Sequence, residues 1–162
     1  MIPLSLAIGG TSFAVALLFL LLGPYSNFAP AGYLDPWFYT GYFLHFSYLF
    51  QQHGLTYYVS RLPYIVPGLL LFKIAPPVTA SVLLNALIMA SSLAALYCIV
   101  SWHYGNLPAT LAGIALMTNT YFMAGVAWDY PDGPAVAYAL LALAAFSRPT
   151  TPDIRVPSAV IG

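Results

Sequence analysis

The stretch 78–100, VTASVLLNALIMASSLAALYCIV, contains no charged residue and comes directly after Pro76 and Pro77. An apolar run of about 20 residues matches the roughly 30 Å hydrocarbon core of a bilayer. Proline at the first helical position is typical of a helix start. The stretch therefore predicts a transmembrane helix and indicates a membrane protein.

The composition of the whole chain supports this interpretation. Of its 162 residues, 61% are hydrophobic and only 5% are charged, whereas a soluble domain carries about 25% charged residues. So few charges cannot cover a water-facing surface. The formal net charge is zero, which argues against nucleic-acid binding. The single cysteine excludes an intrachain disulfide and a multi-cysteine zinc site.

Three further apolar runs are bounded by Pro, Gly or polar residues, which commonly interrupt secondary structure. They cover residues 4–22, 109–127 and 134–147. No Lys or Arg precedes the first run, so it is interpreted as a retained helix and not as a signal peptide. The last run is short for a span, and it gains length if Asp132 caps it and Pro134 occupies its first turn. The expected fold class is an all-α membrane protein with about four transmembrane helices.

Between the first two spans lies the long segment 23–77, which is rich in aromatic residues. Trp and Tyr favour the membrane–water interface. Residues 36–52 mix aromatic and polar side chains and predict a helix lying in the interface. Residues 64–75 are apolar but too short to span, and predict a re-entrant or interfacial helix. Membrane anchoring is the simpler explanation of the aromatic residues, and stacking on a substrate is the alternative.

The predicted spans place the aspartates on one side of the membrane. An even number of crossings separates segment 23–77, which contains Asp35, from the loop 128–133, which contains Asp129 and Asp132. Both loops therefore face the same compartment. The numbers of basic residues on the two sides are equal, so the positive-inside rule leaves the orientation open.

Carboxylates beside a bilayer are costly unless they are solvated, paired or functional. Asp35 precedes Pro36, a position compatible with a helix cap as well as with catalysis. Asp132 has a capping explanation too, whereas Asp129 has none. Arg61, on the same face, could pair with Asp35 or bind a phosphate. Such carboxylates can supply a general base and bind a hydroxyl or a divalent metal ion, and no other cofactor is expected.

The order of these features carries a family resemblance. A membrane helix is followed by a long loop that opens with Asp35 and later contains RLPYIVP at 61–67, an Arg-x-Pro-x-x-x-Pro pattern. After two more helices, WDYPD at 128–132 leads into an apolar helix of Ala-Leu-Leu-Ala-Leu type. Over residues 1–148 this order resembles the C-type (GT-C) membrane glycosyltransferases, and most closely the protein O-mannosyltransferase and aminoarabinose-transferase-like enzymes.

The resemblance implies an inverting enzyme that takes a sugar from a polyprenyl-phosphate donor in the membrane and transfers it to an acceptor. It implies that Asp35 is the catalytic carboxylate. Asp132, with Asp129 as the competing choice, and Arg61 are then substrate-binding residues. It also implies a multi-pass protein of the cell (inner) membrane, with the site on the periplasmic, extracytoplasmic face.

Members of that family are considerably longer, so residues 1–148 are expected to form the N-terminal portion of such an enzyme, as a fragment or a truncated copy, with a degenerate, inactive relative as the alternative. Residues 149–162 are expected to be a flexible polar tail. The alternative is a small non-catalytic multi-pass scaffold protein. A transporter is disfavoured, because the predicted spans contain no charged residue.

Overall fold

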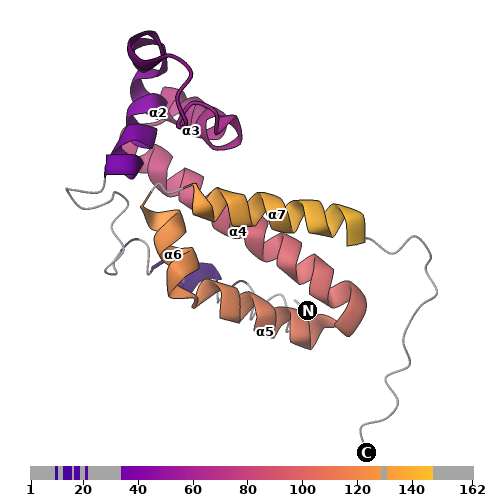
Figure 1. The fold of residues 1–162 in the computed structure, drawn as a ribbon. Coiled ribbons are helices and arrows are strands. Elements are labelled where there is room, and N and C mark those ends of the chain that lie inside the picture. Colours follow the sequence, from indigo (N-terminus) through magenta and orange to yellow (C-terminus); the bar gives the residue numbers. More distant parts are fainter. Residues whose placement is uncertain are drawn as a thin grey trace, which may run out of the picture.

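The computed structural model describes residues 34–128 and 131–147, together with isolated helical positions between residues 10 and 21. Within these residues every regular element is a helix (Figure 1). The predicted span 4–22 lies mostly outside the described residues, and the predicted tail 149–162 lies wholly outside them. The helices, labelled as in Figure 1, are α2 (Leu34–His53), α3 (Leu62–Ile74), α4 (Pro77–Tyr104), α5 (Asn106–Met117), α6 (Thr120–Ala127) and α7 (Asp132–Ser147).

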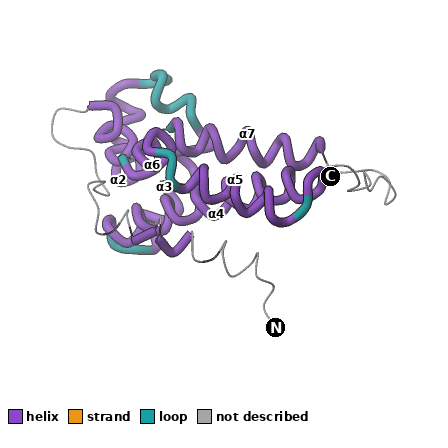
Figure 2. Tube along the Cα trace, turned by 90° about the horizontal axis from the view of Figure 1, so that it is seen from below, coloured by secondary structure: helices purple, strands orange, loops and turns teal. Residues whose placement is uncertain are grey.

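Helix α4 is the centre of the fold and confirms the helix predicted over 78–100. Its 28 residues correspond to about 42 Å at 1.5 Å per residue. In the described part of the chain, it is the one continuous helix that is long and apolar enough to cross a membrane. Helices α5 and α7 run alongside it in both views (Figures 1 and 2).

The expected single helix over 109–127 is corrected, because the structure divides it into α5 and α6, bent by 60°. The Thr118 hydroxyl donates back to the carbonyl of Ile114 at 2.9 Å. The Asn119 side chain accepts from the N–H of Phe122 at 3.0 Å and so caps α6. Such side-chain hydrogen bonds to the backbone compete with a continuous helix. By length and composition the bent pair is either one broken span or a re-entrant loop.

Two glycines have separate roles at the ends of helices: Gly105 allows a tight turn, and Gly133 allows two helices to approach closely. Gly105 alone separates α4 from α5, and its φ of 85° lies in the left-handed region that favours glycine. Gly133, at the start of α7, lies against α6. A Cβ atom at Gly133 would lie 3.0 Å from both the carbonyl oxygen of Gly125 and the Cα atom of Val126. A larger residue at Gly133 would therefore push α6 and α7 apart.

Helices α2 and α3 form an aromatic unit at the N-terminal end of α4 (Figure 1). Both were expected as helices, and α2 is kinked at His45, where φ is −134° and ψ is 43°. The rings of Tyr39, Phe43 and Tyr64 are buried and pack on one another. Membrane anchoring thus explains only the outward-facing aromatic residues, because the others build a core between the two helices. The exposed ones on α2 are Trp37, Tyr48 and Phe50.

Helix α7 lies on the opposite side of α4 from α5 and has its N-terminal end beside the α2–α3 unit (Figure 1). Its buried residues are small or compact: Gly133, Pro134 and Ala137. The Tyr138 hydroxyl donates to the carbonyl of Pro63 at 2.6 Å, which ties α7 to the start of α3. These contacts bring the segment before α3 and the start of α7 together, although they are far apart in the sequence.

Candidate functional site at the N-terminal ends of α3 and α7

Arg61 is held in place by the start of α3. Its carbonyl oxygen accepts from the N–H groups of Tyr64 and Ile65, at 2.9 and 3.0 Å. Pro63 occupies the first turn of the helix, where a missing N–H costs nothing. The backbone of Arg61 is therefore fixed, and its side chain projects from a helix end.

The guanidinium group of Arg61 contacts tyrosines. Its NH1 donates to the Tyr39 hydroxyl at 2.6 Å. Its Cζ lies 4.0 Å from the ring centroid of Tyr57, which is 62% exposed. A cation over an aromatic face at an exposed site is stabilised by about 0.5–1 kcal/mol. Arg61 is thus positioned by one hydroxyl and one ring.

Tyr39 is completely buried, with 0% of its surface exposed. Burial raises the pKa of its hydroxyl to about 12, although the neighbouring Arg61 acts in the opposite direction. Its ring makes edge contacts with Tyr58 and Tyr64, each with a centroid distance of 5.4 Å. The hydroxyl that holds Arg61 is therefore neutral at physiological pH and sits on a ring that is packed from several sides.

Asp35 lies in the first turn of α2. Its Oδ1 accepts from the Tyr58 hydroxyl at 2.6 Å. The Tyr58 ring stacks on Phe38, with centroids 4.9 Å apart, and meets the edge of Tyr39. Asp35 and Arg61 are therefore joined through Tyr58 and Tyr39.

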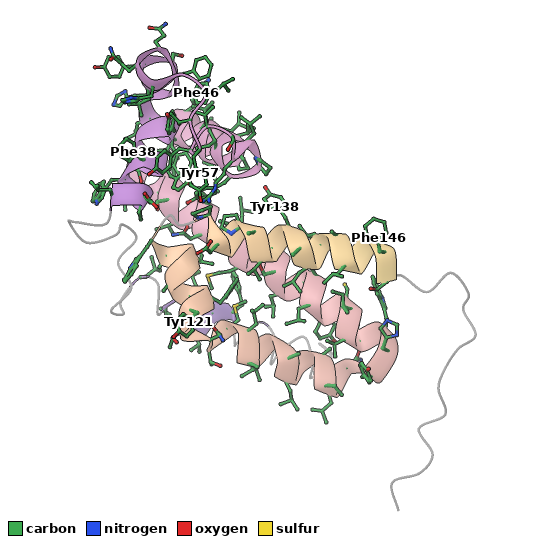
Figure 3. All side chains as sticks on the ribbon, viewed as in Figure 1. Phe38, Phe46, Tyr57, Tyr121, Tyr138 and Phe146 are labelled. Atoms are coloured by element: carbon green, nitrogen blue, oxygen red, sulfur yellow. The ribbon has the colours of Figure 1, made fainter. Side chains whose placement is uncertain are left out.

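Asp132 is the first residue of α7 and is exposed. Together with Arg61 it lines a pocket of about 300 Å³ between the start of α3 and the start of α7. Figure 3 shows Tyr57 at the base of the α2–α3 unit, beside the end of α7 that carries Tyr138. The remaining pocket walls are mostly apolar: Pro63, Tyr64, Pro131, Pro134, Ala135 and Tyr138.

The structure brings together part of the predicted site. Arg61 and Asp132 share the pocket. Asp35 is not one of the pocket-lining residues and reaches Arg61 through the two tyrosines. Asp129 lies outside the described residues. The pocket thus combines a cation, which suits an anionic group, with a carboxylate, which suits hydroxyl groups.

The sequence left open whether these carboxylates bind a divalent metal ion. Among the residues that the structure describes, no group of three or more His, Cys, Asp or Glu side chains could hold one.

Tyr39 and Tyr58 were not predicted as site residues, because the aromatic residues of this segment have a sufficient explanation in membrane anchoring or substrate stacking. One signal was present in the sequence. Tyr39 follows Asp35 by four residues in a predicted helix, and residues four apart lie on the same helix face. No comparable signal pointed to Tyr58, which lies beyond the end of α2.

Comparisons of the chain with protein-family models, with curated proteins and with solved structures give no match. The proposed function therefore rests on Arg61, Asp132 and Asp35, and on the tyrosines that bind Arg61 and Asp35.

Proposed function

We propose that this chain forms part of the donor and acceptor site of a membrane glycosyltransferase that uses a polyprenyl-phosphate sugar. The observation that carries the proposal is the pocket lined by Arg61 and Asp132. A sugar phosphate needs a cation for its phosphate and hydrogen-bond acceptors for its hydroxyl groups. Both kinds of side chain border this pocket.

In this proposal, Arg61 binds the phosphate of the donor. Guanidinium groups bind phosphate with several N–H donors in a planar arrangement. Stabilising the charge that develops on a leaving phosphate also lowers the barrier to glycosyl transfer. The apolar walls of the pocket, such as Pro63 and Pro134, suit the first carbons of the lipid chain.

Asp35 acts as the general base that takes the proton of the acceptor hydroxyl. A positioned base makes a hydroxyl a better nucleophile. The hydrogen bond from Tyr58 fixes the direction of the Asp35 carboxylate. Asp132, or Asp129 in the same loop, binds sugar or acceptor hydroxyls.

The proposal includes a multi-pass arrangement with four spans and with the pocket at the periplasmic face of the cell membrane. Helices α2 and α3 then lie at the interface. The exposed aromatic residues of α2 support this placement, because Trp and Tyr favour that zone. The phosphate group of a polyprenyl phosphate lies at the membrane–water interface, which is the depth proposed for α2 and α3.

Binding of a short-chain polyprenyl phosphate to the full chain in lipid nanodiscs tests the proposal. Arg61→Gln is expected to weaken binding about ten- to 150-fold, because hydrogen bonds to charged groups contribute about 1.5–3 kcal/mol. Lys73→Gln is the control, since Lys73 is exposed in the last turn of α3 and does not line the pocket.

Equal affinities for wild type, Arg61→Gln and Lys73→Gln would contradict the proposal. Absence of saturable binding by the wild-type chain would also contradict it and would favour the non-catalytic scaffold.

A further inference from the structure

Asp35 and Arg61 carry opposite charges on two elements that pack together, yet each is hydrogen-bonded to a tyrosine. Asp35 accepts from Tyr58, and Arg61 donates to Tyr39, each at 2.6 Å. The rings of these two tyrosines touch, with centroids 5.4 Å apart. The carboxylate and the guanidinium group are therefore each bound to a phenol hydroxyl, and the rings of the two phenols are in contact.

This arrangement differs from the one that the two charged groups would adopt by themselves. Arginine and a carboxylate within reach form a two-pronged pair, which is strong and leaves little net charge. A neutral phenol can hold either group and leaves its charge intact. The charge on Arg61 then remains available to an anionic ligand in the pocket.

Tyr39 is suited to this role by its surroundings. It is fully buried, and its ring packs against Tyr58 and Tyr64. Its pKa, raised by burial to about 12, keeps the hydroxyl protonated. The side chain is thus fixed in position and uncharged.

We propose that Tyr39 is a positioning residue that holds Arg61 at the pocket and keeps its guanidinium group from pairing with Asp35. The ligand-binding consequence rests on the proposed function, because it requires an anion that binds at Arg61. The separation of the two charges is a property of the chain without ligand and is measured separately.

The first measurement uses the chain without ligand. Arg61, Arg148 and Arg155 are the three arginines of the chain, so side-chain ¹⁵N NMR of arginine-labelled protein in detergent gives few signals. Arg61→Gln identifies the Arg61 signal. The chemical shift of this signal is expected to change in Tyr39→Phe, because Arg61 then pairs with Asp35. In the double variant Tyr39→Phe/Asp35→Asn, which lacks that carboxylate, the chemical shift is expected to return towards the wild-type value.

Tyr42→Phe is the matched control for the loss of a buried hydroxyl. Tyr42 is 1% exposed on the same helix, and its hydroxyl bonds to Thr56 and not to Arg61. The Arg61 signal is expected to stay in place in this variant. An Arg61 signal that responds equally to Tyr39→Phe and Tyr42→Phe would overturn the proposal.

The second measurement is the affinity for a short-chain polyprenyl phosphate in nanodiscs. Tyr39→Phe is expected to weaken binding about tenfold. This factor corresponds to the lower end of the free energy that a hydrogen bond to a charged group contributes. Adding Asp35→Asn is expected to restore most of the affinity, because the competing carboxylate is gone. A double variant that stays as weak as Tyr39→Phe would show a merely structural role for Tyr39 and would overturn the proposal.

The two proposals fail in different ways. If the NMR signal of Arg61 behaves as expected but no phosphate binding depends on Arg61, the proposed function is wrong and the separation of charges stands. If phosphate binding depends on Arg61 but neither measurement distinguishes Tyr39→Phe from Tyr42→Phe, the positioning role of Tyr39 is wrong.

Discussion

The residues of the site differ in what holds them. Asp35 and Arg61 each have a tyrosine hydroxyl as partner, whereas Asp132 is exposed at the start of α7. A carboxylate fixed by one hydrogen bond keeps its remaining lone pairs for a substrate hydroxyl. Asp35 therefore has the better-defined geometry for a base, and Asp132 has the greater freedom to follow a ligand.

Replacing Asp35 tests its role as the base. In a membrane preparation that transfers sugar from a polyprenyl phosphate, Asp35→Asn is expected to lower the rate about 10²–10⁴-fold, because a positioned general base is lost. Asparagine keeps the size of the side chain and can still accept from Tyr58. Asp153→Asn, in the polar tail of the sequence, is the control. A folded Asp35→Asn protein with an unchanged rate would show that Asp35 has only a structural role.

The charged members of the site were predictable from the sequence, because charges are rare in this chain and Asp35, Arg61 and Asp132 flank apolar runs. The tyrosines that bind Asp35 and Arg61 were not predicted. Aromatic residues near a membrane have an adequate explanation in anchoring, and the hydropathy pattern does not reveal which rings face inward. The pairing of Tyr58 with Asp35 depends on how the chain returns after α2, which only the three-dimensional packing shows.

Some features of the helices were predictable from the sequence and others were not. Helix α4 was predictable because its apolar run is long and begins after two prolines. The break between α5 and α6 was not predicted, although the polar residues Thr118, Asn119 and Thr120 interrupt the apolar run 109–127. That break depends on the Thr118 hydroxyl and the Asn119 amide, which bond to nearby backbone groups. A short polar segment inside an apolar run does not by itself show whether the helix continues through it or breaks there.

The contact between α6 and α7 gives a prediction for this pair of helices. Gly133→Leu is expected to destabilise the protein by about 1–3 kcal/mol, the usual cost of overpacking, because a Cβ atom there approaches the backbone of Gly125 and Val126. Ala142→Leu, at an exposed position of α7, is the control. Thermal unfolding in detergent, followed by circular dichroism, measures both. Equal melting temperatures would contradict the close contact.

On the scale of the whole molecule, α4 separates two ends. The α2–α3 unit and the start of α7 lie at one end, and the turn between α4 and α5 lies at the other (Figure 1). The pocket is at the first of these ends, because residues at the starts of α3 and α7 line it. If α4 crosses the membrane, as its length and composition allow, these ends lie in different compartments. The proposed lipid-phosphate donor then has access to the pocket from one side only.

Cysteine labelling in intact cells tests this arrangement. With Cys98→Ala as background, Ser60→Cys is expected to react with an impermeant maleimide from outside. Asn106→Cys is expected to react only after permeabilisation. Both positions are exposed, which makes them a matched pair. Labelling of Asn106→Cys alone would reverse the orientation, and labelling of both would show that α4 does not cross.

The shortness of α7 has a consequence for the surrounding lipid. Its 16 residues correspond to about 24 Å at 1.5 Å per residue, less than the roughly 30 Å hydrocarbon core of a bilayer. If α7 is a span, as in the proposed four-span arrangement, it is shorter than the bilayer, and such a hydrophobic mismatch thins the membrane around the helix. Asp132 stands at one end of this helix, so lipid headgroups would then be drawn towards the pocket there. The length of α7 would by this means set how far a lipid-borne phosphate must move to reach Arg61.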